Sequence, residues 1–227
     1  MGLSIPYNDY NGKLLFSASP DATSKDSNQK LEKFLLHLEG LEAKGKLPCA
    51  LDLKKFRSDL DQGMHFDSSI PQGFGVGSSG AIVAAIYDNY SLDKIASDAN
   101  MSNEKFIALK KIFGALESYY HGKSSGLDPL ICYLNLPVLI KSKSEVGTVG
   151  LPDTSKGKGA IFLMNTGTTG KTQPLVQHFM ERCKEDGFRK MLKGQFKKYN
   201  DACIEAYGEG NFDPDNDGDT IPNEDDA

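Results

Sequence analysis

Residues 71–80 form the segment of the chain best suited to bind phosphate, and they read Pro-Gln-Gly-Phe-Gly-Val-Gly-Ser-Ser-Gly. Glycines allow backbone amide groups to approach an anion, and the N-terminus of the helix expected from Ala81 to Tyr90 adds a positive dipole. The hydroxyls of Ser78 and Ser79 could bind a phosphate oxygen or Mg²⁺. An ordinary connection between a strand and a helix is the alternative, and the segment alone favours neither.

Two common nucleotide-binding motifs are matched only in part. Residues 75–80 have the spacing G-x-G-x-x-G, but the polar region 91–100 offers no second apolar strand ending in an acidic residue, which a Rossmann fold requires. Residues 165–172 read Asn-Thr-Gly-Thr-Thr-Gly-Lys-Thr, so Asn165 replaces the first glycine of a P-loop. Such a loop could still bind substrate or phosphate at the start of a helix.

Glu117 and Asp128 are the candidates for metal binding and proton transfer. Glu117 lies near the end of an amphipathic helix, and Asp128 begins another helix after a Ser/Gly turn. A helix end, a turn and a helix start can fold the chain back, so two carboxylates eleven residues apart could face one site. One could hold Mg²⁺ and the other accept a proton from a hydroxyl. A surface glutamate and a capping aspartate are the alternative, and His121 is interpreted as a helix C-terminal residue.

The last sixteen residues carry seven of the 31 acidic residues and contain no lysine or arginine. Their spacing fits the EF-hand pattern D-x-D-x-D-G-x₅-E, and alternating carboxylates supply the oxygen ligands that Ca²⁺ prefers. Because Pro214 and Pro222 disfavour flanking helices, the tail looks more like a thrombospondin type 3 repeat. The candidate calcium ligands are Asp213, Asp215, Asp217, Asp219 and Glu224. A disordered tail, or a junction from a fused or mispredicted reading frame, is the alternative.

Composition narrows the class of protein. Without the tail the chain is close to neutral, which does not favour a nucleic-acid binder. The apolar runs are too short for a membrane-spanning helix, and the N-terminus has no features of a signal peptide. The four cysteines are far apart in sequence and are expected to be reduced core thiols. These features favour a cytoplasmic protein.

The hydrophobic pattern predicts an α+β fold. A strand pair is expected at residues 3–5 and 13–17, turned at Asn11-Gly12, and a polar loop at residues 18–27. Further strands are expected at 64–70, 137–141 and 160–164. Helices are expected from Asn28 to about residue 44, from 81 to 90, from Ser102 to His121, from 172 to 184 and from 187 to 207.

Residues 71–80 resemble the phosphate loop P-x-G-x-G-L-G-S-S-A of the GHMP kinases, with Val76 for leucine and Gly80 for alanine. This family includes galactokinase, homoserine kinase, mevalonate kinase and phosphomevalonate kinase. Residues 117–128 are similar to the pattern E-x-x-x-H-G-x-P-S-G-x-D of mevalonate kinases, with Ser124 replacing the proline.

The second pattern separates mevalonate kinase from galactokinase and homoserine kinase, so mevalonate kinase is the member most resembled. Residues 165–176 also fit the loop that precedes the family's C-terminal helices, and the resemblance covers roughly residues 1–207. It implies a two-domain architecture, incomplete here, with an N-terminal mixed sheet with helices and a C-terminal α/β domain. The expected divisions are residues 1–150, 151–211 and the acidic tail 212–227.

The resemblance also implies that the chain binds ATP and Mg²⁺ and transfers the γ-phosphate to the 5-hydroxyl of mevalonate. Ser79 and Glu117 would bind Mg²⁺, and Asp128 would orient or deprotonate the mevalonate hydroxyl. The implied phosphate cradle consists of Gly73, Gly75, Gly77, Ser78 and Ser79. The residues implied to lie near the substrate are Ser125, Gly126 and Thr172.

Two parts of the family pattern have no counterpart in the sequence, namely an N-terminal loop carrying a lysine and a C-terminal loop T-G-x-G-G-G-G. We therefore expect weak ATP binding and slow or absent turnover, because losing one charge-stabilising group can cost about 10²–10³ in rate. A non-catalytic remnant or surface protein that binds Ca²⁺ through its tail remains an alternative. Another GHMP member, such as phosphomevalonate kinase, would differ only in substrate.

Overall fold

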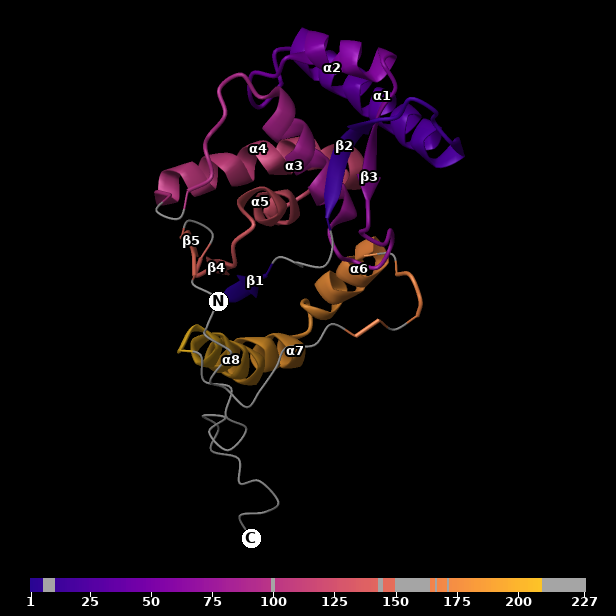
Figure 1. Ribbon diagram of the computed structural model, residues 1–227. Coiled ribbons are helices and arrows are strands. Elements are labelled where there is room, and N and C mark those ends of the chain that lie inside the picture. Colours follow the sequence, from indigo (N-terminus) through magenta and orange to yellow (C-terminus); the bar gives the residue numbers. More distant parts are fainter. Residues whose placement is uncertain are drawn as a thin grey trace. The chain divides into compact units, whose positions relative to one another are not determined.

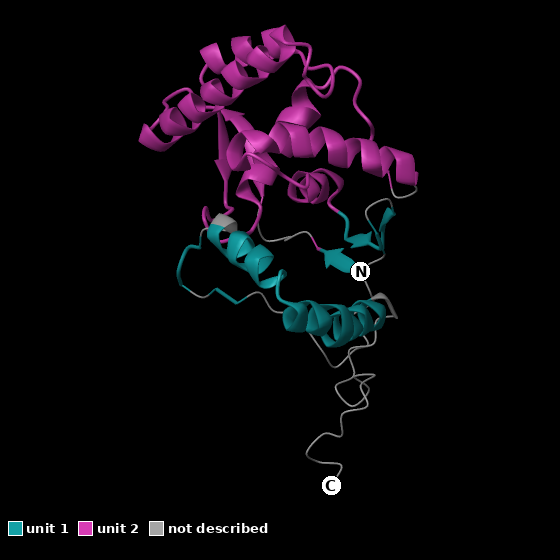
Figure 2. Ribbon diagram, turned by 180° about the vertical axis from the view of Figure 1, so that it is seen from behind, with its two compact units in different colours: residues 1–4, 136–227 teal, residues 5–135 magenta. Residues whose placement is uncertain are grey.

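The computed structural model describes residues 1–5, 11–98, 101–142, 145–149, 164–165, 167–170 and 172–209. Helices and short strands are mixed within them, which confirms the α+β class. The chain divides into two compact units, shown in Figure 2. We call Ile5–Asn135 the central unit, and Met1–Ser4 with Leu136–Ala227 the terminal unit.

The central unit contains a two-stranded antiparallel sheet. Strand β2 (Gly12–Phe16) pairs with β3 (Met64–Ser68), as Figure 1 shows. The prediction that residues 3–5 and 13–17 pair as a hairpin is wrong. Strand β1 (Gly2–Ser4) pairs with β4 (Val138–Ile140) instead. Gly12 lies inside β2, where an added Cβ would meet the ring of Phe66. Close packing against that ring therefore explains this glycine better than a turn does.

Helix α1 (Ala22–Ala43) begins within the region expected to be a polar loop. The Asp21 carboxylate caps it by accepting a hydrogen bond of 2.7 Å from the Ser24 amide. Asn28 then donates to the Met64 carbonyl of β3 at 2.7 Å. Polar residues of the first turns thus stabilise the helix and dock it on the sheet. Of the apolar residues at three- and four-residue spacing that predict this helix, Leu41 is only half-buried, and four are buried: Leu31, Phe34, Leu35 and Leu38.

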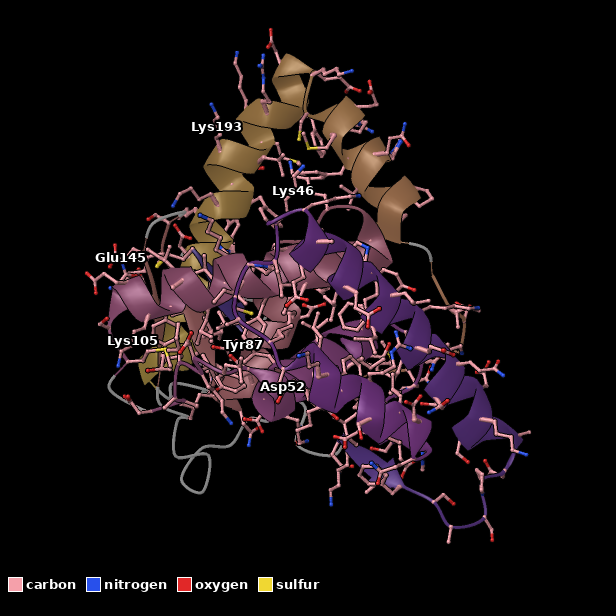
Figure 3. All side chains as sticks on the ribbon, turned by 90° about the horizontal axis from the view of Figure 1, so that it is seen from above. Lys46, Asp52, Tyr87, Lys105, Glu145 and Lys193 are labelled. Atoms are coloured by element: carbon pink, nitrogen blue, oxygen red, sulfur yellow. The ribbon has the colours of Figure 1, made fainter. Side chains whose placement is uncertain are left out.

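Helix α2 (Leu53–Asp61) was not expected from the sequence. Asp52, labelled in Figure 3, caps it by accepting a hydrogen bond of 2.9 Å from the Lys55 amide. Phe56 and Leu60 are buried four residues apart, and α2 packs beside α1. The signal was present in the sequence as a capping aspartate before a short amphipathic turn.

Helices α3 (Ser78–Tyr90), α4 (Asn103–His121) and α5 (Leu127–Leu134) pack on one another and form much of the core. Tyr87 of α3 has its ring edge-on to Phe113 of α4 and Tyr133 of α5, with centroids 5.0 and 5.3 Å apart. Figure 3 labels Tyr87 among these side chains. Helix α4 begins after Ser102 and ends at His121, as predicted, with Gly122 at its C-cap.

The terminal unit has a three-stranded antiparallel sheet in the order β1-β4-β5, where β5 is Val146–Thr148. Helix α6 (Thr172–Arg182) matches the first predicted C-terminal helix. The second consists of α7 (Asp186–Met191), a π-helical turn η1 (Leu192–Phe196) and α8 (Lys197–Glu209). Asn200 of α8 donates to the carbonyl of Met1, the residue before β1, at 2.8 Å. This bond joins α8 to the start of β1.

Several sequence expectations concern residues that are not described. The strand expected at residues 160–164 falls almost wholly outside the described residues, and so does the tail from residue 210. The divisions at residues 150 and 211 therefore stay predictions. Among the described residues, no helix is both long and apolar enough to cross a membrane. Cys132 and Cys203 are exposed, so the expectation of core thiols is wrong for these two.

Candidate functional site

The glycine-rich loop enters α3 through backbone conformations that favour glycine. Gly73, Gly75 and Gly77 have φ values of 83°, 74° and 76°. A residue with a side chain pays roughly 1–2 kcal/mol for that left-handed conformation. Gly77 occupies the N-cap position and has no side chain to cap α3. The amide groups of the first turn, from Ser78 onward, can therefore hydrogen-bond an anion.

Helix α3 approaches α5 backbone to backbone at Gly80. A Cβ added to Gly80 would lie 2.7 Å from both the Asp128 carbonyl carbon and the Pro129 nitrogen. Glycine is therefore required by packing at the position where the GHMP pattern has alanine. A Cβ added to Gly77 would lie 3.7 Å from the Asp128 Cβ. Asp128 consequently lies beside the last turn of the glycine loop.

Glu117 is the buried carboxylate of the site, with 3% of its surface exposed. Its Oε1 atom accepts a hydrogen bond of 3.1 Å from the Ser79 hydroxyl. Its Oε2 atom accepts a hydrogen bond from the Ser124 hydroxyl. Both carboxylate oxygens are thus hydrogen-bonded, as a buried charge requires. The two hydroxyls come from the start of α3 and from the turn between α4 and α5.

His121 lies one helical turn after Glu117 and also contacts Ser79. The Ser79 Oγ atom is 2.9 Å from the His121 Nε2 atom. When Ser79 donates its proton to Glu117, its oxygen can accept one from His121 Nε2. Ser79, Glu117 and His121 thus form one hydrogen-bonded chain that joins the first turn of α3 to the last turn of α4.

The pKa values of Glu117 and Asp128 are both raised above those of ordinary carboxylates, which favours their neutral forms. Burial raises the pKa of Glu117, and the negative charge of Asp128 raises it further, while hydrogen bonds from Ser124 and Ser79 oppose the rise. Surrounding protein also raises the pKa of Asp128, although its side chain retains exposed surface, and His121 opposes this shift. A nearby cation would stabilise the ionised forms of both carboxylates and offset their mutual repulsion. The pair therefore favours cation binding at this site.

The donor set fits Mg²⁺ only when a nucleotide supplies additional ligands. A carboxylate and a hydroxyl, from Glu117 and Ser79, are hard oxygen donors of the kind that Mg²⁺ prefers. Among the described residues, no group of three or more His, Cys, Asp or Glu side chains could hold a metal by itself. Magnesium sites commonly combine one or two carboxylates with substrate phosphates and water, so these residues are compatible with Mg²⁺ bound to a nucleotide.

The turn before α5 holds the remaining candidate residues of the central unit. Gly126 has a φ of 74° and packs against α4, where an added Cβ would meet the Lys110 carbonyl and lie 2.5 Å from the Gly114 nitrogen. The exposed Ser125 hydroxyl accepts a 3.4 Å hydrogen bond from the Leu127 amide. Both residues are adjacent in the chain to the segment that contacts Glu117, and their proposed role near substrate stays a prediction.

Other candidates from the sequence are not joined to this site by any described contact. In the loop before α6, Asn165 accepts a 2.7 Å hydrogen bond from the Gly167 amide, and the described residues there are exposed. The Thr172 side chain and the tail ligands Asp213, Asp215, Asp217, Asp219 and Glu224 lie outside the described side chains. Calcium binding by the tail therefore has no support from the described residues.

His121 and Ser124 were not singled out as site residues by the sequence. The signal for His121 was its four-residue spacing from Glu117, which places both on one face of a helix. The signal for Ser124 was its replacement of a proline in the pattern similar to mevalonate kinases. A hydroxyl at that position can bond a carboxylate, and a proline cannot.

A scan against protein families matches residues 44–135 to the GHMP kinases N terminal domain. Neither the curated proteins nor the solved structures contain a match to the chain. The matched residues include the glycine loop and the carboxylates that it meets, and they lie within the central unit. This match supports a relationship to the GHMP kinases, and it suggests a small-molecule kinase.

Proposed function

We propose that this chain is an ATP-dependent small-molecule kinase of the GHMP type, and that mevalonate is its phosphate acceptor. The observation that carries the proposal is the convergence of the glycine loop with two carboxylates. Ser79 bonds Glu117 at 3.1 Å, and Asp128 lies beside Gly77. Phosphoryl transfer depends mainly on positioning and charge neutralisation, which such an arrangement can supply.

Each group has a defined part in the proposed reaction. The amides of the loop Gly73–Ser79 would hold the phosphates of ATP. Ser79 and Glu117 would hold Mg²⁺, whose charge would offset that of the phosphates. The acceptor hydroxyl oxygen forms a bond to the γ-phosphorus as the bond to the β–γ bridging oxygen breaks, and ADP leaves. Asp128 orients this hydroxyl and takes its proton. A carboxylate with a raised pKa suits proton acceptance, and this shift supports the assignment.

Mevalonate is proposed on the segment Glu117–Asp128 alone. This segment is similar to the pattern of mevalonate kinases at every specified position except Ser124. Phosphomevalonate is the second candidate acceptor, because it carries the same carbon skeleton and would meet the same phosphate loop.

The test measures ADP release by the full chain at high enzyme concentration, with mevalonate, phosphomevalonate or no acceptor. We expect ADP release above the acceptor-free rate with mevalonate. ADP release with phosphomevalonate but not with mevalonate would identify phosphomevalonate as the acceptor. The absence of Mg-ATP binding by calorimetry would overturn the kinase proposal. Glu117→Gln is expected to abolish the Mg²⁺ dependence of ATP binding, and Asp93→Asn, an exposed change after α3, is expected to leave it intact.

A further inference from the structure

Ser124 bonds the carboxylate oxygen of Glu117 that is not bonded by Ser79. Ser79, which also contacts His121, donates to Oε1, whereas Ser124 donates to Oε2. If Mg²⁺ binds on the Ser79 side, the Ser79 hydroxyl oxygen must use a lone pair to ligate the metal. Ser124 can then keep its bond to Glu117, because it does not take part in the metal's ligand set.

The Ser124 hydroxyl is itself oriented by the backbone. Its oxygen accepts a 2.9 Å hydrogen bond from the Gly126 amide. That bond leaves the hydroxyl proton directed at Glu117. A Cβ on Gly114 would lie 3.2 Å from the Ser124 carbonyl oxygen, so this part of the turn is packed against α4. The hydroxyl therefore occupies a fixed place relative to the Glu117 carboxylate.

We infer that Ser124 is a positioning residue that keeps the buried Glu117 carboxylate in its metal-binding orientation. This inference rests on the proposed function of the site. Groups that hydrogen-bond metal ligands commonly change metal affinity or activity by about 10–100-fold when they are removed. The replacement of proline by serine in the motif thus adds a hydroxyl partner for the proposed metal ligand.

The experiment compares the affinity for ATP with Mg²⁺ and with EDTA, measured by calorimetry on the full chain. Ser124→Ala is expected to reduce the gain in affinity due to Mg²⁺ by about tenfold and to leave metal-free ATP binding unchanged. Ser118→Ala is the matched control, since Ser118 lies beside Glu117 in sequence but donates to the Ala115 carbonyl. Its Mg²⁺-dependent gain should equal that of the wild type.

Ser124→Thr and Ser124→Val form a second pair with nearly the same side-chain volume. Threonine should preserve the Mg²⁺-dependent gain, and valine should reduce it as alanine does. This pair keeps the inference testable if Ser124→Ala fails to fold, as judged by circular dichroism. Equal gains for threonine and valine would overturn the role of the hydroxyl, and so would an equal loss of ATP affinity with and without metal.

The outcomes for Ser124 and for the kinase proposal are distinguishable. If the wild type binds Mg-ATP, Glu117→Gln loses the Mg²⁺ dependence and Ser124→Ala behaves as wild type, only the Ser124 inference fails. If the folded wild type binds no Mg-ATP, both the proposed function and the Ser124 inference fail. Loss of Mg²⁺ dependence in Ser124→Ala and Ser124→Val, with retention in Ser124→Thr, supports both.

Discussion

The chain has two Gly-rich loops that each precede a helix, and in the described structure only one of them meets the carboxylates of the candidate site. The loop of residues 73–77 contains three glycines with positive φ and leads into α3, whose first turn contacts Glu117 and Asp128. In the described residues 164–165 and 167–170, Gly167 alone has a positive φ. An added Cβ at Gly167 or Gly170 would meet nothing within 4 Å.

The helices after the two loops differ in the same way. Tyr90 at the end of α3 is buried, and its hydroxyl donates to Asp59 at 2.8 Å. On α6, by contrast, Leu175 and Met180 are 68% and 58% exposed. A loop composition suited to phosphate is therefore insufficient. A site also requires a packed helix that brings charged side chains from distant sequence positions to the loop.

The largest expected effect is on catalysis by Asp128. Asp128→Asn should lower kcat by about 10²–10⁴ while Mg-ATP affinity stays near that of the wild type, because general-base catalysis contributes this much. The measurement is single-turnover phosphorylation of mevalonate together with calorimetry. An unchanged kcat would remove Asp128 from the reaction and weaken the contrast between the two loops.

The next largest effect is on stability at the turn before α5. Gly126→Ala should cost about 3 kcal/mol or more, because it combines a positive φ with overlap on the backbone of α4. Gly170→Ala in the other loop should stay within about 0.5 kcal/mol, since its Cβ would meet open space. Urea unfolding of both variants measures the difference, and equal costs would contradict the packing described here.

Gly80→Ala should destabilise by about 2 kcal/mol, because its Cβ would lie 2.7 Å from the backbone of α5. Gly167→Ala is the companion change, and it should cost about 1 kcal/mol from its positive φ without overlap. Thermal unfolding can rank these two variants. A more stable Gly80→Ala would mean that α3 and α5 can separate at no cost.

A smaller effect is expected on nucleotide binding. Ser79→Ala should weaken Mg-ATP binding about tenfold, since it removes a proposed metal ligand that is also bonded to Glu117. Thr169→Ala changes an exposed hydroxyl in the second loop and should leave the affinity unchanged. If calorimetry gives the reverse order, the second loop is the phosphate site.

The smallest expected effect concerns the hydrogen bond from Tyr90, at the end of α3, to Asp59. Burial raises the pKa of Asp59, but the hydrogen bonds from Lys55 and Tyr90, with the charge of Lys55, outweigh it and lower the pKa overall. A lowered pKa adds stability above the ordinary value of aspartate, and this stability is lost as the pH falls through the folded-state value. Tyr90→Phe should therefore cost about 1 kcal/mol at pH 7 and less at acid pH.

Urea unfolding at pH 7 and at pH 3 tests this dependence, with Tyr199→Phe as the exposed control. The control should match the wild type at both values. If Tyr90→Phe lowers the free energy of unfolding equally at pH 7 and pH 3, the charge of Asp59 does not contribute to its hydrogen bond with Tyr90.

The sequence predicted most helices of the central unit well, because their stability rests on local signals. Helix α4 was predicted from Ser102 at its start, Gly122 after its end, and apolar residues at helical spacing between them: Phe106, Leu109, Phe113 and Leu116. The partner of β1 could not be predicted, because strand pairing depends on contacts across more than 130 residues. The start of α1 was missed because its first residues are polar, and one of them, Ser27, bonds the backbone of Phe66 in β3, which lies far along the chain.

The sequence by itself determined which residues could do chemistry: a glycine loop with hydroxyls, and two carboxylates flanking a short turn. The tertiary structure alone decided that Ser79 meets Glu117 and His121, that Gly80 must be glycine, and that Ser124 supports the buried carboxylate. The physical reason is that loop conformation is encoded locally. Burial and hydrogen bonding of a charged group arise only when separate helices pack together.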